Sequence, residues 1–553
     1  MKVFIKNIVL VSALFLSYYT VYAQTENPVI ASIKKEVDRN MSNLKMEGMP
    51  TPFFISYSVI DLQICNLSAS LGSISSFYEI HQRRGMPNLL VGNYHRNNLK
   101  LAGRYMNQYV TSLHDNTTGI PITIWKELDA SYKDAVEKYQ AKIAILQQRT
   151  QTEEENKLPD LEQVKPVDMI QSPVSFTFNK AYWENYLRKA SEIAQQYPEI
   201  LSSNVSLNVR NATTYTYNTE GSRYTFPHTF YELTFTASTR SYDGQDLTYT
   251  LYRENSTFEQ MPDLATFSNE CKWVMNNLLE LKNAPVVDDA YSGPVLFEGQ
   301  ALLGLLAQVF LSNNKLVAAP QLVQAQGQGS QFGSGPSGGN DFELMLNKKV
   351  ISRDLSLISI TGQEFYKGQR LNGYYPIDAE GVAPAKEMML IENGVLRNLL
   401  NGRVPTNKFQ HSNGHVRYDY NSYANRTLPG NLLITGKQTF SYDDLRKKLI
   451  EAALEEDLEY AYVVKEMGGG APFIYKVYVA DGREELVRGA TITDGASLRP
   501  FKRILGVSDK EQMKNYGQIP TTVISPTAML FEEMDVTRMQ NIEFKKPYIV
   551  AKP

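Results

Sequence analysis

The feature that most constrains the fold is a stretch at residues 205–258, which is rich in Thr, Tyr, Val and Phe. These residue types favour extended strands on a half-buried surface. Turn signals interrupt the stretch at residues 218–221, Asn-Thr-Glu-Gly, and at Asp243-Gly244. The pattern predicts an antiparallel meander, and the helices of this part of the chain are expected to pack against it.

Helical spacing precedes the meander in two places. An apolar stripe with polar residues between its members is formed by Val29, Ile33, Val37, Met41 and Leu44, and a β-type run at residues 53–60 follows it. A second stripe begins at residue 126 and ends near residue 146, and a proline-containing polar stretch separates it from a helical pattern at residues 180–197. We interpret residues 126–197 as a helical arm that projects from the first domain.

The chain is long enough for two domains, and a polar stretch at residues 284–294 is the expected boundary. Beyond it we expect a buried helix at residues 295–310, a polar surface loop at residues 324–340, many short strands, and a helix at residues 442–457. The sequence predicts an α+β fold. Its parts are a mixed α/β N-terminal domain at residues 24–285, with the arm, and a β-rich C-terminal domain at residues 286–553.

The first 23 residues are typical of a secretory signal peptide. Lys2 and Lys6 precede a short apolar run, and small residues end at Ala23, where cleavage is expected. The next residue is Gln24 and not a cysteine, which argues against a lipid anchor, and no later segment is apolar enough to anchor the chain. We expect an exported protein, periplasmic or secreted, with no membrane anchor after cleavage.

Composition excludes several classes of function. The formal net charge is −3 and there is no sustained Lys/Arg block, so nothing indicates nucleic-acid binding. Only Cys65 and Cys271 are present, which excludes a four-cysteine zinc site. The two cysteines could pair in an oxidising compartment, or both could be buried free thiols.

Two histidines are weak candidates for a metal site. His411 and His415 stand four residues apart, a spacing that places two imidazoles on one face of a helix. The intervening Ser-Asn-Gly disfavours a helix, and no acidic or cysteine partner is evident nearby. Histidines of a surface loop are the alternative interpretation.

The second half of the chain carries a resemblance to a known family. Residues 371–384 read LNGYYPIDAEGVAP and residues 390–396 read LIENGVL, and they resemble the TldD/PmbA family of zinc peptidases, also named modulators of DNA gyrase. Residues 411–417, 426–431 and 525–533 continue the resemblance in the same order. Together these blocks cover most of residues 290–540.

The resemblance implies a two-domain dimer with an internal chamber, where extended peptides add as strands before cleavage. In active TldD-type members a His-Glu-x-x-x-His motif and a later cysteine hold zinc. Here the matching positions are Ala307, Gln308 and Ser312, no histidine lies between His228 and His411, and no cysteine follows Cys271. The resemblance is therefore to the PmbA-type subunit, which lacks the motif and pairs with an active TldD-type chain.

Three functional hypotheses follow. The first is the non-catalytic subunit of a peptidase complex, with no cofactor of its own and zinc only from a zinc-motif partner in a homo- or hetero-dimer. The second is a homodimeric peptide-binding or assembly protein, and the third is a metallopeptidase with a relocated site at His411 and His415. The candidate substrate contacts are Asp378, Glu380, Gly381, Asn393, Gly394, Asn413, Gly414 and Arg417. The alternative for these residues is tight β-turns that need Gly and Asn at positive φ.

Overall fold

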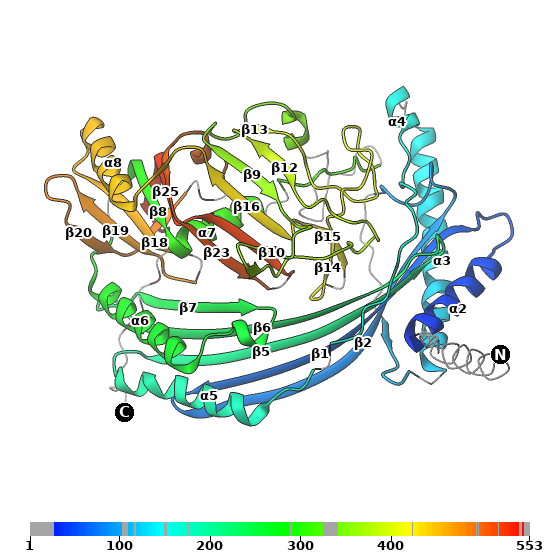
Figure 1. Cartoon of the computed structure of the whole chain (residues 1–553), viewed down its shortest axis with the longest axis horizontal. Coiled ribbons are helices and arrows are strands. Elements are labelled where there is room, and N and C mark those ends of the chain that lie inside the picture. Colours follow the sequence, from blue (N-terminus) through cyan, green and yellow to red (C-terminus); the bar gives the residue numbers. More distant parts are fainter. Residues whose placement is uncertain are drawn as a thin grey trace, which may run out of the picture.

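The computed structural model shows two domains, one seated on a long curved sheet of the other (Figure 1). It describes residues 27–546 except 102–108, 116–117, 149–151, 175, 288–289, 313–314, 324–340, 423, 468, 494, 496, 518, 541–542 and 544. The predicted signal peptide and the predicted loop at 324–340 lie outside the described residues. Among the helices that are described, none has the length and apolar character needed to cross a membrane.

The N-terminal domain is built on a seven-stranded sheet with the order β3-β2-β1-β5-β6-β4, and β7 pairs with β6. The strands are β1 Pro52–Ser70, β2 Ser73–Val91, β3 Tyr109–Thr111, β4 Asp168–Met169, β5 Ser202–Asn218, β6 Arg223–Arg240 and β7 Asp246–Asn255. The predicted meander is confirmed, since β5, β6 and β7 pair antiparallel through the two expected turns.

Alternation along β1 sorts its side chains between two environments. Ile55 and Tyr57 belong to a core with two helices at one end of the sheet, and Cys65 belongs to a second helical core at the other end. Ile60 and Leu62, which have the opposite parity, pack against the C-terminal domain. The sheet therefore has helices on its convex face and the second domain on its concave face.

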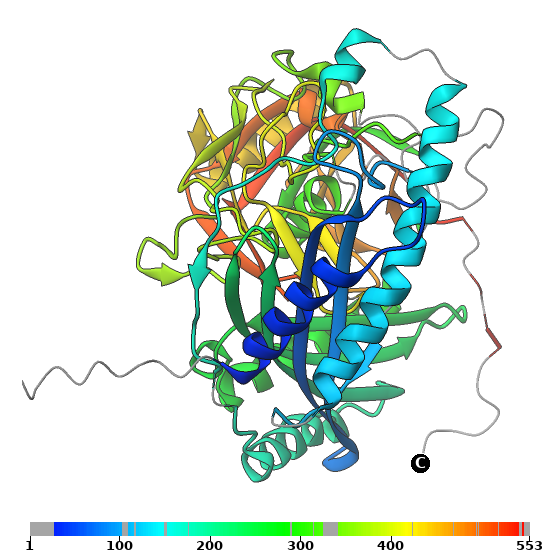
Figure 2. The same cartoon turned by 90° about the vertical axis from the view of Figure 1, so that its right-hand side faces the viewer.

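The helices of this domain are α2 Pro28–Asn43, α3 Gly119–Gln147, α4 Glu153–Lys157, α5 Lys180–Glu192 and α6 Leu264–Asn283. Figure 2 shows α2 and α3 crossing one end of the sheet. The predicted arm is wrong: α3 buries its stripe against α2 and β1, whereas α5 packs with α6 at the opposite end. The apolar stripes do form helices, but each stripe packs against the sheet of its own domain instead of projecting from it.

One buried carboxylate stands out in the core beneath α3. Glu127 has no exposed surface and accepts a hydrogen bond from the Tyr57 hydroxyl, but its Oε1 has no hydrogen-bond partner in the part of the chain that the structure describes. Burial raises the pKa of Glu127 to about 8, because an ionised carboxylate loses its hydration there.

The C-terminal domain is mostly β. Its strands are β8 Tyr291–Glu298, β9 Leu355–Ser359, β10 Phe365–Tyr366, β11 Gln369–Arg370, β12 Met388–Glu392, β13 Val395–Leu396, β14 Val416–Asp419, β15 Ala424–Thr427, β16 Asn431–Gly436, β17 Thr439–Phe440, β18 Tyr460–Glu466, β19 Phe473–Tyr478, β20 Glu484–Val487, β21 Ala490–Ile492, β22 Ile504–Ser508, β23 Glu511–Tyr516, β24 Thr521–Pro526 and β25 Ala528–Arg538. A six-stranded sheet has the order β13-β12-β9-β16-β24-β23, and an eight-stranded sheet has the order β17-β22-β25-β8-β18-β19-β20 with β21 on β25.

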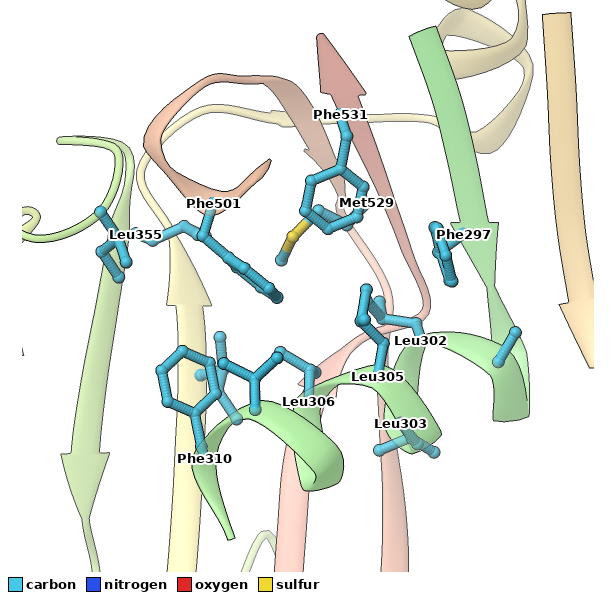
Figure 3. Close-up of a cluster of buried hydrophobic side chains, with 14 of the residues drawn as sticks. Phe297, Leu302, Leu303, Leu305, Leu306, Phe310, Leu355, Phe501, Met529 and Phe531 are labelled. Atoms are coloured by element: carbon cyan, nitrogen blue, oxygen red, sulfur yellow. The ribbon is translucent and has the colours of Figure 1, made fainter. Parts of the chain in front are cut away.

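Two helices complete this domain, α7 Gly299–Phe310 and α8 Tyr442–Glu455. The expected helix at residues 295–310 was partly wrong, because residues 295–298 belong to β8, which pairs with β18 and β25. The apolar face of α7 fills the core between the sheets, and Figure 3 shows the inward side chains Leu302, Leu305, Leu306 and Phe310 directed toward Phe501, Met529 and Phe531.

The two cysteines do not form a disulfide. Cys65 and Cys271 are both free and fully buried, and both belong to the core under α5 and α6. Burial raises the pKa of Cys65 to about 11 and also raises that of Cys271, so both thiols stay protonated. Of the two alternatives that the sequence left open, the structure has the buried free thiols.

Candidate functional site

A cavity of the described structure lies between the domains, with a volume of about 740 Å3. Its walls come from β6 and β7 on the concave face of the N-terminal sheet, and from α7, β18 and β23 of the C-terminal domain. A concave space of this size between two domains is a common place for a ligand. We call it the cleft.

One face of α7 forms part of the cleft wall. Gln300, Gly304, Ala307, Gln308 and Leu311 line the cleft at helical spacing, while the opposite face of the helix is buried in the core. Ser312, just after the helix, also lines the cleft. The structure therefore brings Ala307, Gln308 and Ser312, the three positions singled out from the sequence, to one wall of the cleft.

Two strands that border the cleft, β7 and β23, each pair with another strand along one edge only, as far as the described strands show. Among the described strands, β7 pairs only with β6 and β23 pairs only with β24. On its outer edge β7 is partly covered, since the Thr250 amide donates to the Gly469 carbonyl at 2.6 Å and the Ala471 amide donates to Thr248 at 2.8 Å. Beyond this contact, residues 251–254 of β7 line the cleft. An extended peptide could lengthen a sheet at such an edge.

The predicted substrate contacts lie outside the cleft. Two of them, Asp378 and Glu380, belong to a second meeting point of the domains, which we call the clasp. The clasp consists of Arg403, Glu380 and Asp378 of the C-terminal domain with Glu162 and Glu220 of the N-terminal domain. The Arg403 guanidinium donates to Glu220 and to the Glu162 carbonyl, both at 2.6 Å. The side chains of Arg403 and Glu220 are buried, with 3% and 5% of their surface exposed. The Arg403 amide donates to Glu380 Oε2 at 2.8 Å.

Asp378 organises the loop that carries Glu380 and Gly381. Its Oδ1 accepts from the amides of Glu380 and Val382 at 2.9 Å, and its Oδ2 accepts from the Val416 amide at 3.0 Å. Gly381 has φ +82°, which suits glycine. Burial, followed by the charge of Glu380, raises the pKa of Asp378. These contacts make the loop a turn, and the Tyr224 hydroxyl of the N-terminal domain donates to its Ala379 carbonyl at 2.8 Å.

Arg417 is buried behind the cleft. Its guanidinium donates to the Pro520 carbonyl at 2.8 Å and stacks over the Tyr375 ring at 4.4 Å. Together with Asp378 it borders a void of only about 10 Å3, which is too small for a peptide.

The remaining predicted contacts are in turns. Asn393 and Gly394 connect β12 to β13 with φ values of +45° and +78°. Asn413 accepts from the Asn401 amide at 2.9 Å, and Gly414 has φ +76° with no room for a Cβ beside Pro384. None of the eight predicted contacts is among the residues that line the cleft. Their role as substrate contacts stays a prediction. In the structure these residues form turns and intramolecular hydrogen bonds.

His411 and His415 do not share a site. The exposed His411 ring contacts Glu162 through Nδ1 at 2.8 Å, whereas the buried His415 contacts Ser359 at 2.9 Å and the Asn413 carbonyl at 2.8 Å. Burial lowers the pKa of His415 to about 3, so its ring is neutral. Nothing in the described part of the chain groups three His, Cys, Asp or Glu side chains in a way that could hold a metal ion. This geometry argues against the relocated metal site.

Comparison with known proteins identifies the second domain. Residues 293–538 match the family model described as the PmbA/TldA metallopeptidase C-terminal domain. The C-terminal domain of the chain belongs to the TldD/PmbA family. The expected α+β, two-domain fold of TldD/PmbA type is thereby confirmed. No curated protein sequence matches the chain at a significant level.

Solved structures share the fold of both domains. A protein described as a candidate modulator of DNA gyrase from Thermotoga maritima is 15% identical, with a TM-score of 0.59 over 91% of this chain and 100% of that chain. TldE from Thermococcus kodakarensis is 10% identical, with a TM-score of 0.54 over 92% and 100%. A second candidate gyrase modulator, from Bacteroides thetaiotaomicron, is 11% identical, with a TM-score of 0.55 over 92% and 98%.

The residues of the cleft do not fit the zinc that the family name implies. Ala307 has no donor atom in its side chain, and Gln308 and Ser312 offer a neutral amide and a hydroxyl where the TldD-type pattern has Glu and His. An amide cannot accept a proton from zinc-bound water as a carboxylate does. We therefore derive no chemical step through a metal on this chain.

Sequence reasoning missed the charged residues of the cleft. Glu232, Glu254, Glu466 and Lys514 come from four different strands of two domains, and all four line the cavity. No motif links them in the sequence. The local signal was that each of these charged residues lies inside a strand in which apolar and polar residues alternate.

Proposed function

We propose that this chain is an exported, non-catalytic member of the TldD/PmbA family, which holds extended peptides in its cleft while a zinc-bearing TldD-type partner cleaves them. The observation that carries the proposal is that Ala307, Gln308 and Ser312, which the resemblance aligns with the zinc motif, all line the cleft at α7 and just after it. Peptide binding is supported by the residues of β7 that border the cleft, because a strand edge can pair with an extended backbone.

The test is metal analysis and peptide cleavage with the purified chain. We expect no stoichiometric zinc and no cleavage by the chain alone, because two zinc ligands and the general base are replaced. One tightly held zinc per chain, or cleavage that a chelator abolishes, would contradict the proposal.

The role as one half of a pair requires a partner with an intact motif. Affinity purification from native extract should recover a homologue that carries His-Glu-x-x-x-His, identified by mass spectrometry. Recovery of this chain only as a homodimer would favour the alternative of a peptide-binding or assembly protein without an active partner.

Export is supported by the character of residues 1–23. Cell fractionation followed by N-terminal sequencing should find the mature chain outside the cytosol, beginning at Gln24. A mature protein that still begins at Met1 in the cytosol would contradict export. If export holds, the catalytic partner must be exported as well.

A further inference from the structure

Two carboxylates stand side by side on the floor of the cleft. Glu232 of β6 and Glu254 of β7 are direct cross-strand partners, and both line the cavity. Like charges that face each other across a strand pair destabilise a sheet. The sheet tolerates this repulsion at the one part of its concave face that borders the cleft.

A third carboxylate faces them from the other domain. Glu466 of β18 lines the same cavity and accepts a hydrogen bond from the Tyr249 hydroxyl at 2.6 Å. Among the described residues that line the cleft, Lys514 of β23 is the only lysine. Its ammonium group attracts the carboxylates of Glu254 and Glu466. One ammonium group therefore serves two of the three carboxylates.

The other cations near the cleft are already engaged. Arg253 forms an ion pair with Glu270 of α6 at 2.7 Å, and Arg426 lies 3.9 Å from Asp419. Arg210 attracts Glu232, but its guanidinium also donates to Asn421 at 2.6 Å. The three carboxylates keep an excess of negative charge.

The electrostatics agree with this geometry. Burial and then the charge of Glu232 raise the pKa of Glu254 to about 7, and burial raises the pKa of Glu232 and of Glu466. The carboxylates are too dispersed for a metal ion, as judged over the described residues. A cation on a long, flexible side chain could reach between them.

We propose that the cleft selects extended peptides that carry a lysine or arginine side chain, whose cation lies between Glu232, Glu254 and Glu466. The inference rests on the proposed function, because it assumes that a peptide lies along the edge of β7. In an added strand, alternate side chains point toward the concave face where the two carboxylates lie. Entry of the cation would relieve the repulsion between Glu232 and Glu254. This relief would contribute to the free energy of peptide binding.

The experiment measures binding of four acetylated and amidated peptides to the purified chain by isothermal titration calorimetry. The peptides consist of alanine and threonine and differ at one central residue, which is lysine, arginine, norleucine or glutamate. We expect the lysine and arginine peptides to bind about tenfold more tightly than the norleucine peptide, as for a charge-assisted contact in a partly buried site. The difference should shrink as salt is added.

The variant that tests the placement is the double substitution E232Q/E254Q. It removes a repulsion and keeps the shapes of both side chains, so it is expected to fold, which a thermal melt checks. The preference for lysine over norleucine should fall from about tenfold to near one. The matched control is E451Q on the exposed face of α8, which should keep the full preference.

Each outcome decides between the inference and the proposed function. Equal binding of the lysine and norleucine peptides, or tighter binding of the glutamate peptide, overturns the inference and leaves peptide holding intact. A full preference in E232Q/E254Q overturns the placement of the cation. If none of the four peptides binds, peptide holding fails and the inference fails with it.

Discussion

The clasp and the cleft are two places where the same pair of domains meets, and they differ in the space beside their buried charges. At the clasp, the Glu220 carboxylate has the Arg403 guanidinium at 2.6 Å and the Tyr94 hydroxyl at 2.9 Å. In the cleft, Glu232 and Glu254 face each other, Lys514 attracts Glu254, and Arg210 attracts both carboxylates. The clasp is closed around its charges, whereas the cleft has about 740 Å3 of space beside them.

The difference separates structural charge from functional charge. A buried ion pair between two domains, such as Arg403 with Glu220, fixes their relative geometry. Carboxylates whose negative charge is only partly balanced by nearby cations, and which border an open space, can still be stabilised by a cationic ligand. Charged residues at a domain boundary therefore indicate a binding site only where their compensation is incomplete and a cavity adjoins them.

The largest expected effect comes from breaking the clasp. R403M should lower the free energy of unfolding by about 3–5 kcal/mol, because it leaves the Glu220 carboxylate buried without its cation. Urea denaturation followed by circular dichroism measures the change. The control is R397M, whose ion pair with Glu392 is exposed and should contribute less than about 1 kcal/mol. If R403M unfolds at the same urea concentration as the parent chain, the clasp does not stabilise the domain interface.

An intermediate effect is expected at Glu127, which is fully buried and has one carboxylate oxygen without a hydrogen-bond partner among the described residues. Its pKa of about 8 in the folded chain lies above the ordinary value of 4.5. The folded state therefore binds the proton more tightly, and stability is lost as the pH rises from about 4.5 through about 8.

E127Q mimics the protonated form, so its stability should not fall over this range. The difference in free energy of unfolding between E127Q and the parent chain should grow by on the order of 2 kcal/mol from about pH 5 to about pH 9. E137Q, at an exposed position of the same helix, is the control and should show no such growth. A constant difference at all pH values would mean that Glu127 is ionised, or solvated, throughout.

The smallest effect is expected in the cleft. E254Q should raise the free energy of unfolding by about 0.2–1 kcal/mol, because it removes the cross-strand repulsion with Glu232. Urea denaturation of E254Q and of the surface control E451Q measures it. A loss of stability in E254Q would show that Glu254 is compensated in the folded chain, and the contrast between clasp and cleft would then disappear.

Much of the fold could be read from local patterns. The meander of β5–β7, the stripe of α2, and α8 lie where the sequence predicted them, since strand and helix periodicities are encoded within one segment. The stripe that becomes α3 was also recognised, but its place against the sheet was not. At residues 295–298 the apolar run suits a strand or a helix equally, and pairing with β18 and β25 decided for the strand.

The sequence by itself determined what this chain lacks. No histidine lies between His228 and His411, so α7 carries no His-Glu-x-x-x-His motif whatever the fold does, because the identity of a ligand is a property of the residue. Only the tertiary structure decided which residues face each other. Glu232 and Glu254 are cross-strand partners, whereas His411 and His415 have separate partners, since such contacts depend on how strands and domains meet in space.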